Sequence, residues 1–227
     1  MKKLISDETV WCEDIWRFGV RYYKSENHDH QVTLPEFDGT RYIIAHNCAI
    51  STDVMKTNIF GSVAMQTTRT PHIKMIKDSF FIDIMFPGLQ LNEDKVYHIP
   101  DHPTGNLSYM DGGTNSTAIE PARKGLPVVN YVHFPEGMSQ TLHTHPSQRI
   151  GLVLSGTGAI ELGEYPNDQY FSLAKGTAFW MNRNELHNFM CNSGEDVTLF
   201  VFAPDSGMGP TDEFNPLKAR TYIEQTG

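Results

Sequence analysis

The stretch from Gly137 to Gly156 reads GMSQTLHTHPSQRIGLVLSG and holds two histidines separated by one residue. Alternate residues of an extended strand point to the same side, so His143 and His145 can direct both imidazoles at one point. A third imidazole is available further along the chain in His187, within NRNELHNF. Three converging imidazoles suit a divalent transition metal, and this pattern therefore predicts a metal site.

The sequence from residue 126 onward consists of short apolar segments with turn signals between them. Those segments, rich in β-branched and aromatic residues, are PVVNYVHF, IGLVLSG, GAIEL, QYFSLA, TAFWM, HNFMC and VTLFVFA. Regularly spaced short strands are typical of an antiparallel sandwich or barrel. Neither a βαβ alternation nor a Gly-rich phosphate loop interrupts them. We therefore expect an all-β fold.

The first part of the chain also predicts strands. The segments with strand composition are WRFGVRYY, TRYIIAH, NIFGSVAMQTT and FFIDIMF. A short helix is expected over residues 7–16, with Ser6 or Asp7 as its cap. Residues 97–125 are rich in Pro and Gly, which exclude a regular element of any length and favour a boundary or a lid.

These signals divide the chain into four parts. The expected parts are an N-terminal extension over 1–96, a loop-rich connector or lid over 97–125, a barrel over 126–204 and a C-terminal tail over 205–227. The extension either adds strands to the single barrel, which we favour, or forms a degenerate second barrel.

A second pair of histidines has the same spacing as the first. His28 and His30 lie in the polar segment KSENHDHQ, without a preceding Gly or a following apolar run. This context favours a solvated loop, and a degenerate second metal site is the alternative.

Charge and composition limit the classes of partner. The 227 residues carry a net charge of −9, from 18 basic and 27 acidic residues. No Lys/Arg-rich block occurs, which argues against nucleic acid and against an anionic membrane surface. No window approaches the about 18 apolar residues of a membrane span. A small molecule is the expected partner.

The cysteines and the N-terminus indicate a cytoplasmic protein. Cys12, Cys48 and Cys191 form an odd, sparse set without a CxxC motif, as expected of reduced thiols acting as small buried hydrophobes. The first residues lack the apolar region of a signal peptide.

The stretch around the first histidine pair resembles the first motif of the cupin superfamily. That motif is a Gly, five residues, H-x-H, three or four residues, a Glu, six residues and a Gly. Gly137, His143, His145 and Gly156 match it, and Arg149 stands where the Glu is expected. The register of the motif is intact despite this replacement.

The segment around His187 is similar to the second cupin motif, but more distantly. Gly176 and His187 match, Asn182 and Asn184 replace a Pro and a Gly, and Asn192 lies one place late. The resemblance covers residues 126–204.

The resemblance implies a cupin-type antiparallel jelly-roll β-barrel that holds a metal in its interior. Carried over by position, the metal ligands are His143, His145 and His187. The site is then of the three-His type without the commoner Glu, and any of Fe, Mn, Ni, Cu or Zn accepts imidazole ligands. Cupins often pair through barrel edges, so a homodimer is also expected.

Arg149 stays protonated and cannot be a metal ligand, and two interpretations remain open. In the first it points inward on the same side as Gly151, which leaves room for a ligand, and it clamps a substrate carboxylate. In the second it pairs with a local Asp or Glu and the site has lost catalysis. Other candidates for substrate binding are Gln148, Phe179, Met181 and Phe189.

The cupin resemblance implies an enzyme. The favoured interpretation is an Fe(II) dioxygenase that acts on a small carboxylate-bearing molecule. Three-His cupins such as gentisate-type dioxygenases also lack the Glu of the first motif. Two alternatives stay open. One is a lyase or isomerase that uses the metal as a Lewis acid, and the other is a non-catalytic, small-molecule-binding or sensory cupin.

Overall fold

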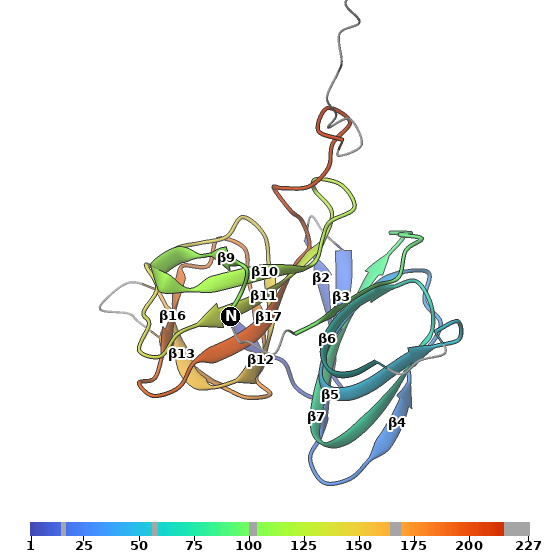
Figure 1. Ribbon diagram of the computed structural model, residues 1–227, viewed down its shortest axis with the longest axis horizontal. Helices are drawn as coiled ribbons and strands as arrows, with labels where there is room; N and C mark the ends of the chain where they lie inside the picture. Colours follow the sequence, from blue (N-terminus) through green and yellow to red (C-terminus); the bar gives the residue numbers. More distant parts are fainter. Residues whose placement is uncertain (15–16, 56–58, 100–103, 164–168, 216–227) are drawn as a thin grey trace, which may run out of the picture.

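The computed structural model describes residues 1–14, 17–55, 59–99, 104–163 and 169–215. Within those ranges the chain is built of β-strands, and the one helical element is the 3₁₀ turn η1 (Met110–Gly112). The strands form two lobes that lie side by side (Figure 1). No helix in the described ranges has the length and hydrophobicity to cross a bilayer.

The first lobe is a curled antiparallel sheet in the order β2-β3-β7-β5-β6-β8, with β4 also paired to β7. Its strands are β2 (Thr9–Glu13), β3 (Arg17–Ser25), β4 (His30–Thr33), β5 (Gly39–Thr52), β6 (Ile59–Thr67), β7 (Pro71–Pro87) and β8 (Lys95–His98). The register between β5 and β7 shifts between His46 and Cys48, where Asn47 has a φ of 58°. This bulge bends both long strands, so the sheet folds over on itself.

The second lobe contains two antiparallel sheets that face each other. One has the order β1-β15-β12-β17-β11-β10-β9 and the other the order β14-β13-β16. Their bounds are β1 (Lys2–Lys3), β9 (Leu107–Ser108), β10 (Thr114–Ile119), β11 (Val128–Phe134), β12 (Arg149–Ser155), β13 (Thr157–Leu162), β14 (Gln169–Ala174), β15 (Ala178–Met181), β16 (His187–Cys191) and β17 (Val197–Ala203).

Strand β12 of the larger sheet carries apolar side chains on both faces. On β12, Ile150 and Leu152 belong to the core shared with the first lobe, whereas Val153 belongs to the core inside the second lobe. The period of two along a strand produces this division. β12 therefore reads as a continuous apolar run, as expected of a strand covered on both sides.

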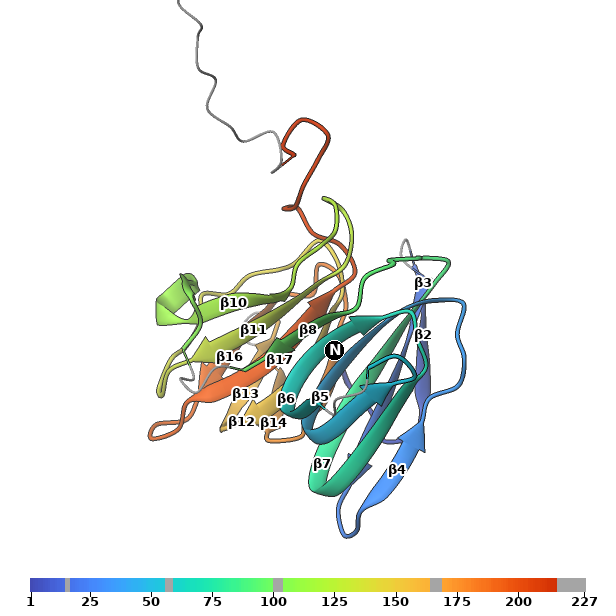
Figure 2. The same ribbon diagram turned by 45° about the vertical axis from the view of Figure 1, so that its right-hand side comes forward.

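The two lobes share one hydrophobic core. Phe18 from β3 stacks on Trp180 from β15 with 5.3 Å between ring centroids, and it also meets Phe202 edge-on at 5.7 Å. All three side chains are at most 4% exposed. Figure 2 shows the sheet of the first lobe lying along the large sheet of the second. Burial on this scale fixes the two lobes against each other.

Two sequence-based expectations for local structure are wrong. The predicted helix over residues 7–16 is the strand β2 in its described part, because Thr9–Glu13 pairs with β3 and buries Cys12; residues 15–16 lie outside the described ranges. The connector 97–125 is not free of regular structure. It contains β9 and the six-residue strand β10, which pairs with β11.

The described cysteines are all free thiols. Cys12 and Cys48 are buried, and Cys191 is partly buried. Of the expected tail 205–227, residues 216–227 lie outside the described part. The first residues of the tail hydrogen-bond to the loop before β11, since Gly125 N donates to Ser206 O at 2.8 Å and Lys124 N donates to Pro210 O at 3.0 Å.

Candidate metal centre

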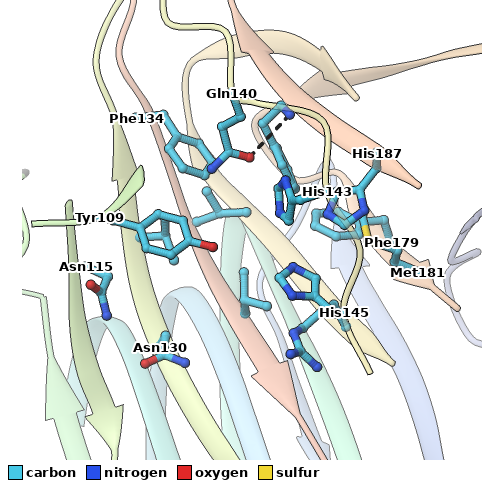
Figure 3. Close-up of a pocket in the computed structure, with 15 residues that line it drawn as sticks. Tyr109, Asn115, Asn130, Phe134, Gln140, His143, His145, Phe179, Met181 and His187 are labelled. Atoms are coloured by element: carbon cyan, nitrogen blue, oxygen red, sulfur yellow. Dashed lines mark hydrogen bonds between the residues drawn. The ribbon is translucent and has the colours of Figure 1, made fainter. Parts of the chain in front are cut away.

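Three imidazoles converge inside the second lobe. His143 and His145 lie on the extended segment before β12, and His187 is the first residue of β16. A bridge joins the two segments, because His143 N donates to His187 O and His187 N donates to His143 O, both at 2.9 Å. The potential ligand atoms of the three rings all lie within 4.8 Å of one another. The three rings face a common space (Figure 3).

The orientation of two rings is set by backbone carbonyls. His143 Nδ1 lies 2.8 Å from Thr141 O, and His187 Nδ1 lies 2.8 Å from Glu185 O. A carbonyl only accepts, so each Nδ1 carries the proton and each Nε2 keeps its lone pair. His187 Nε2 is buried and has no hydrogen-bond partner among the described residues. A buried polar atom without a partner is costly, and a metal ion would satisfy it.

The electrostatic surroundings keep two of these imidazoles neutral. Burial lowers the pKa of His145 to about 3, with a smaller contribution from the positive charge of Arg149. Burial also lowers the pKa of His187 to about 4. Neutral imidazole is the ligand form of histidine, so the donor set fits a divalent transition metal at neutral pH without loss of a proton.

The imidazoles open into a cavity of about 170 Å³. Its walls are mainly apolar, and the predicted pocket residues Phe179, Met181 and Phe189 all line it. The remaining lining residues are Tyr109, Asn115, Asn130, Val132, Phe134, Gln140, Arg149, Leu199 and Val201, together with the three histidines. No Asp or Glu occurs among the described residues that line it.

Four polar residues that line the cavity were not predicted from the sequence: Tyr109, Asn115, Asn130 and Gln140. Tyr109 lies between β9 and η1, in the stretch interpreted as a connector or lid, and directs its hydroxyl into the cavity (Figure 3). Burial raises the pKa of its phenol. One signal was present in the sequence, because Asn130 interrupts the apolar strand VVNYVHF at an inward position.

Arg149 lines the cavity on the inward side of β12. Its Nη1 donates to Ser147 O at 3.1 Å, Ser147 Oγ at 2.7 Å and Gln148 O at 2.9 Å. Ser147 Oγ in turn donates to the carboxylate of Asp205. Burial lowers the pKa of the guanidinium, and Asp205 opposes that shift. Within the described residues no carboxylate bonds directly to Arg149, so its charge is available to a ligand.

Two neighbours of Arg149 lie differently from the expectation. Gln148 is buried and does not line the cavity; its Nε2 donates to Asp14 Oδ2 at 3.2 Å, which directs the amide towards the first lobe. Gly151 does not leave room for a ligand. A Cβ at this position would lie 2.0 Å from Cζ of Phe179, so the space is filled by that ring.

The second histidine pair forms no comparable centre. His28 and His30 have ring centroids 5.6 Å apart, and His30 begins β4. Across the described ranges, the one group of three potential metal ligands is His143, His145 and His187.

The fold and the site define a β-barrel protein with a three-histidine centre in the barrel interior. Residues 130–203 match the family model of the cupin domain, so this part of the chain is a cupin domain. A comparison with curated proteins gives no match.

Solved structures share the fold over both lobes. A cupin 2 conserved barrel domain protein from Leptotrichia buccalis is 15% identical, with a TM-score of 0.56 over 88% of this chain and 91% of that chain. An IolB-like protein from Salmonella typhimurium is 10% identical, with a TM-score of 0.58 over 87% and 86%. Oxalate decarboxylase from Bacillus subtilis is 8% identical, with a TM-score of 0.52 over 92% and 76%.

Proposed function

We propose that this protein is a metal-dependent cupin enzyme, an Fe(II) dioxygenase that acts on a small carboxylate-bearing molecule. The observation that carries the proposal is the composition of one cavity. Three imidazoles meet there beside a guanidinium, and no described lining residue is acidic.

The charge of the site supports an anionic substrate. Neutral imidazoles add no negative charge to a divalent cation, and Arg149 adds a further positive charge to the same cavity. Uncompensated charge in a partly buried site is unfavourable. A substrate carboxylate compensates it by a charge-assisted hydrogen bond to the guanidinium, of the kind that orients a ligand as well as binding it.

The residues around the imidazoles have distinct roles in this proposal. Fe(II), when bound, supplies open coordination positions and electron-transfer chemistry with O2. Arg149 binds and orients the carboxylate. Phe134, Phe179 and Phe189 exclude water from the reacting atoms. Tyr109 stays protonated, because burial raises the pKa of its phenol, and donates a hydrogen bond from the opposite wall.

A metal-dependent lyase is the second candidate. Tyr109 is a proton donor in the cavity, as a lyase requires. The Bacillus subtilis oxalate decarboxylase, which shares the fold, is described with Mn(II) centres. In this alternative the same residues bind the same class of substrate with Mn(II), and no O2 is consumed.

Oxygen consumption separates the candidates. The protein is purified and loaded anaerobically with Fe(II) or Mn(II), and small carboxylic acids are screened with an oxygen electrode and product analysis. We expect O2 uptake that requires Fe(II), matches the substrate consumed and is absent from His187→Ala. Turnover without O2 uptake would favour the lyase. Acids that bind with Fe(II) and O2 present yet are recovered unaltered would favour a binding protein.

A further inference from the structure

A second cavity adjoins the metal centre and shares a wall with it. It has a volume of about 430 Å³, and Asn115 and Asn130 line both cavities. The remaining residues around the second cavity are Leu107, Thr117, Glu120, Pro121, Val128, Ser206, Met208, Gly209 and Pro210. We call this second cavity the outer groove.

Both cavities run along the same face of the sheet. Asn115 on β10 is opposite Val132 on β11, and Thr117 is opposite Asn130. These four residues each line one or both cavities, as alternation along paired strands requires. Tyr131, at an intervening position, instead packs in the core shared with the first lobe. The outer groove is therefore a continuation of the metal-site cavity along the inner face of β10 and β11.

Two carboxamides lie where the cavities meet. Asn115 and Asn130 stand beside each other below Tyr109 (Figure 3). Neither side chain makes a hydrogen bond within the described residues, in contrast to Gln140 of the same cavity, which accepts from Phe189 N. A carboxamide both donates and accepts. The pair therefore suits a hydroxyl or an amide group of a ligand.

The outer groove ends in exposed apolar side chains. Leu107 is 58% exposed and Met208 is 79% exposed. The segment that carries Met208 is held in place, because Gly125 N donates to Ser206 O and Lys124 N donates to Pro210 O. Glu120 is the one charged residue among the described residues around this groove, and it disfavours a second anionic group there.

We propose that the substrate is an elongated monoanionic acid. Its carboxylate lies at the metal centre and Arg149, its hydroxyl or amide group lies between Asn115 and Asn130, and its uncharged, apolar end lies in the outer groove. This assignment rests on the proposed function for the position of the carboxylate. The groove and the two carboxamides add the substrate's length and the group in its middle.

Isothermal titration calorimetry on the Mn(II)-loaded protein tests the assignment with four acids. The probes are acetate, octanoate, 3-hydroxyoctanoate and N-hexanoylglycine. We expect octanoate to bind at least about tenfold more tightly than acetate, because burial of a few methylene groups supplies the free energy of a tenfold change in affinity. One of the two polar acids should bind severalfold more tightly still, and the better one identifies the hydroxyl or the amide as the middle group.

Three variants locate the contributions. Met208→Asp places a charge in the outer groove on an exposed side chain, and it should abolish the advantage of octanoate over acetate. Val54→Asp makes the same change at an apolar side chain of the first lobe that is 56% exposed, and it should leave that advantage intact. Asn115→Ala combined with Asn130→Ala should remove only the additional affinity for the polar acid.

The outcomes distinguish this assignment from the proposed function. If acetate binds and octanoate binds no more tightly, the elongated substrate is excluded and the proposed function stands. The assignment is equally overturned if the advantage of octanoate survives Met208→Asp. If none of the four acids binds the metal-loaded protein, both proposals fail.

Discussion

The two lobes use the same antiparallel architecture and fill it differently. Inside the first lobe, apolar side chains pack without a comparable site; the residues of that core are Tyr23, Leu34, Ile43, Ala45, Cys48, Ile50, Val63, Met65, Ile73, Met75 and Phe81. Its buried charges are paired, since Arg41 contacts Asp83 and also donates to Pro35 O. Inside the second lobe, polar side chains converge on a cavity and His187 Nε2 has no partner among the described residues.

This difference shows what converts a β scaffold into a site. The first lobe pairs its buried guanidinium, Arg41, with Asp83. Its buried polar atoms without a partner, such as Tyr42 Oη and Gln66 Oε1, do not line the metal-site cavity. The second lobe leaves the buried His187 Nε2 without a partner in the cavity that Arg149 also lines, and a buried polar atom of this kind favours an external partner. The proposed ligand site therefore lies in the second lobe.

The largest effect is expected from breaking the ion pair of the first lobe. Asp83→Ala leaves the guanidinium of Arg41 buried without its carboxylate, and it should lower the free energy of unfolding by about 3–5 kcal/mol. Urea denaturation measures this loss. Metal binding by the protein that remains folded should be unchanged.

A double variant provides the control for the ion pair. Arg41→Met with Asp83→Leu replaces both charges by apolar side chains, and it should recover most of the lost stability, because no charge is left unpaired. If Asp83→Ala is as stable as the natural protein, the two lobes do not differ in the way proposed.

The next effect concerns the imidazole without a partner. His187→Ala removes one of three ligands and should weaken Fe(II) or Mn(II) binding by more than about 100-fold, which exceeds the usual cost of losing a residue behind a ligand. Anaerobic metal titration measures the affinity. His30→Ala, which changes a histidine of the first lobe, is the matched control and should bind metal normally. Equal affinities of the two variants would contradict the assignment.

A smaller effect is expected from the guanidinium in the cavity. Arg149→Gln should weaken binding of acetate or formate to the metal-loaded protein by about 10–100-fold, the range for a hydrogen bond to a charged group. Metal affinity should not fall, because a positive charge is removed. Gln148→Ala changes the preceding residue, whose amide faces Asp14, and should leave acid binding unaltered. Loss of acid binding in both variants would indicate a general structural effect instead.

The smallest effect is expected from acid on the metal-free protein. Burial lowers the pKa of His187 from the usual 6.5 of a histidine to about 4, and lowers the pKa of His145 further, to about 3. Below pH 6.5 the unfolded chain binds protons on these imidazoles that the folded chain does not. The contribution of these neutral imidazoles to the free energy of unfolding is thus fully present above pH 6.5, and it is lost as the pH falls towards 4.

Thermal unfolding of the metal-free protein between pH 4 and 7.5 measures this dependence. His187→Asn should flatten the profile in part, since one group with a lowered pKa is removed. A midpoint that does not change between pH 6.5 and 4.5 would mean that these imidazoles are not desolvated.

Local signals predicted much of the second lobe. The segments QYFSLA, HNFMC and VTLFVFA coincide with β14, β16 and β17, because turn residues bound each apolar run. The convergence of His143 and His145 with His187 is confirmed as geometry. Their role as metal ligands, like the role of Arg149, stays a prediction.

Sequence patterns could not predict contacts between residues that are far apart in the sequence. β2 is a strand because it pairs with β3, although its residues also fit a capped helix. Tyr109 enters the site from a loop whose path depends on β10. The ring of Phe179 fills the space above Gly151, a contact between two strands that no local pattern contains. The stacking of Phe18 on Trp180 in the core between the lobes is likewise a contact between residues far apart in the sequence.

X-ray absorption spectroscopy of the metal-loaded protein tests the three-histidine centre most directly. The metal-edge spectrum should show nitrogen ligands at about 2.0–2.2 Å with the outer-shell scattering of imidazole rings, at one metal per chain. His143→Ala, His145→Ala and His187→Ala should each remove that signal. A metal that binds at the same stoichiometry without imidazole scattering, or that is retained in all three variants, would contradict a metal centre in the second lobe.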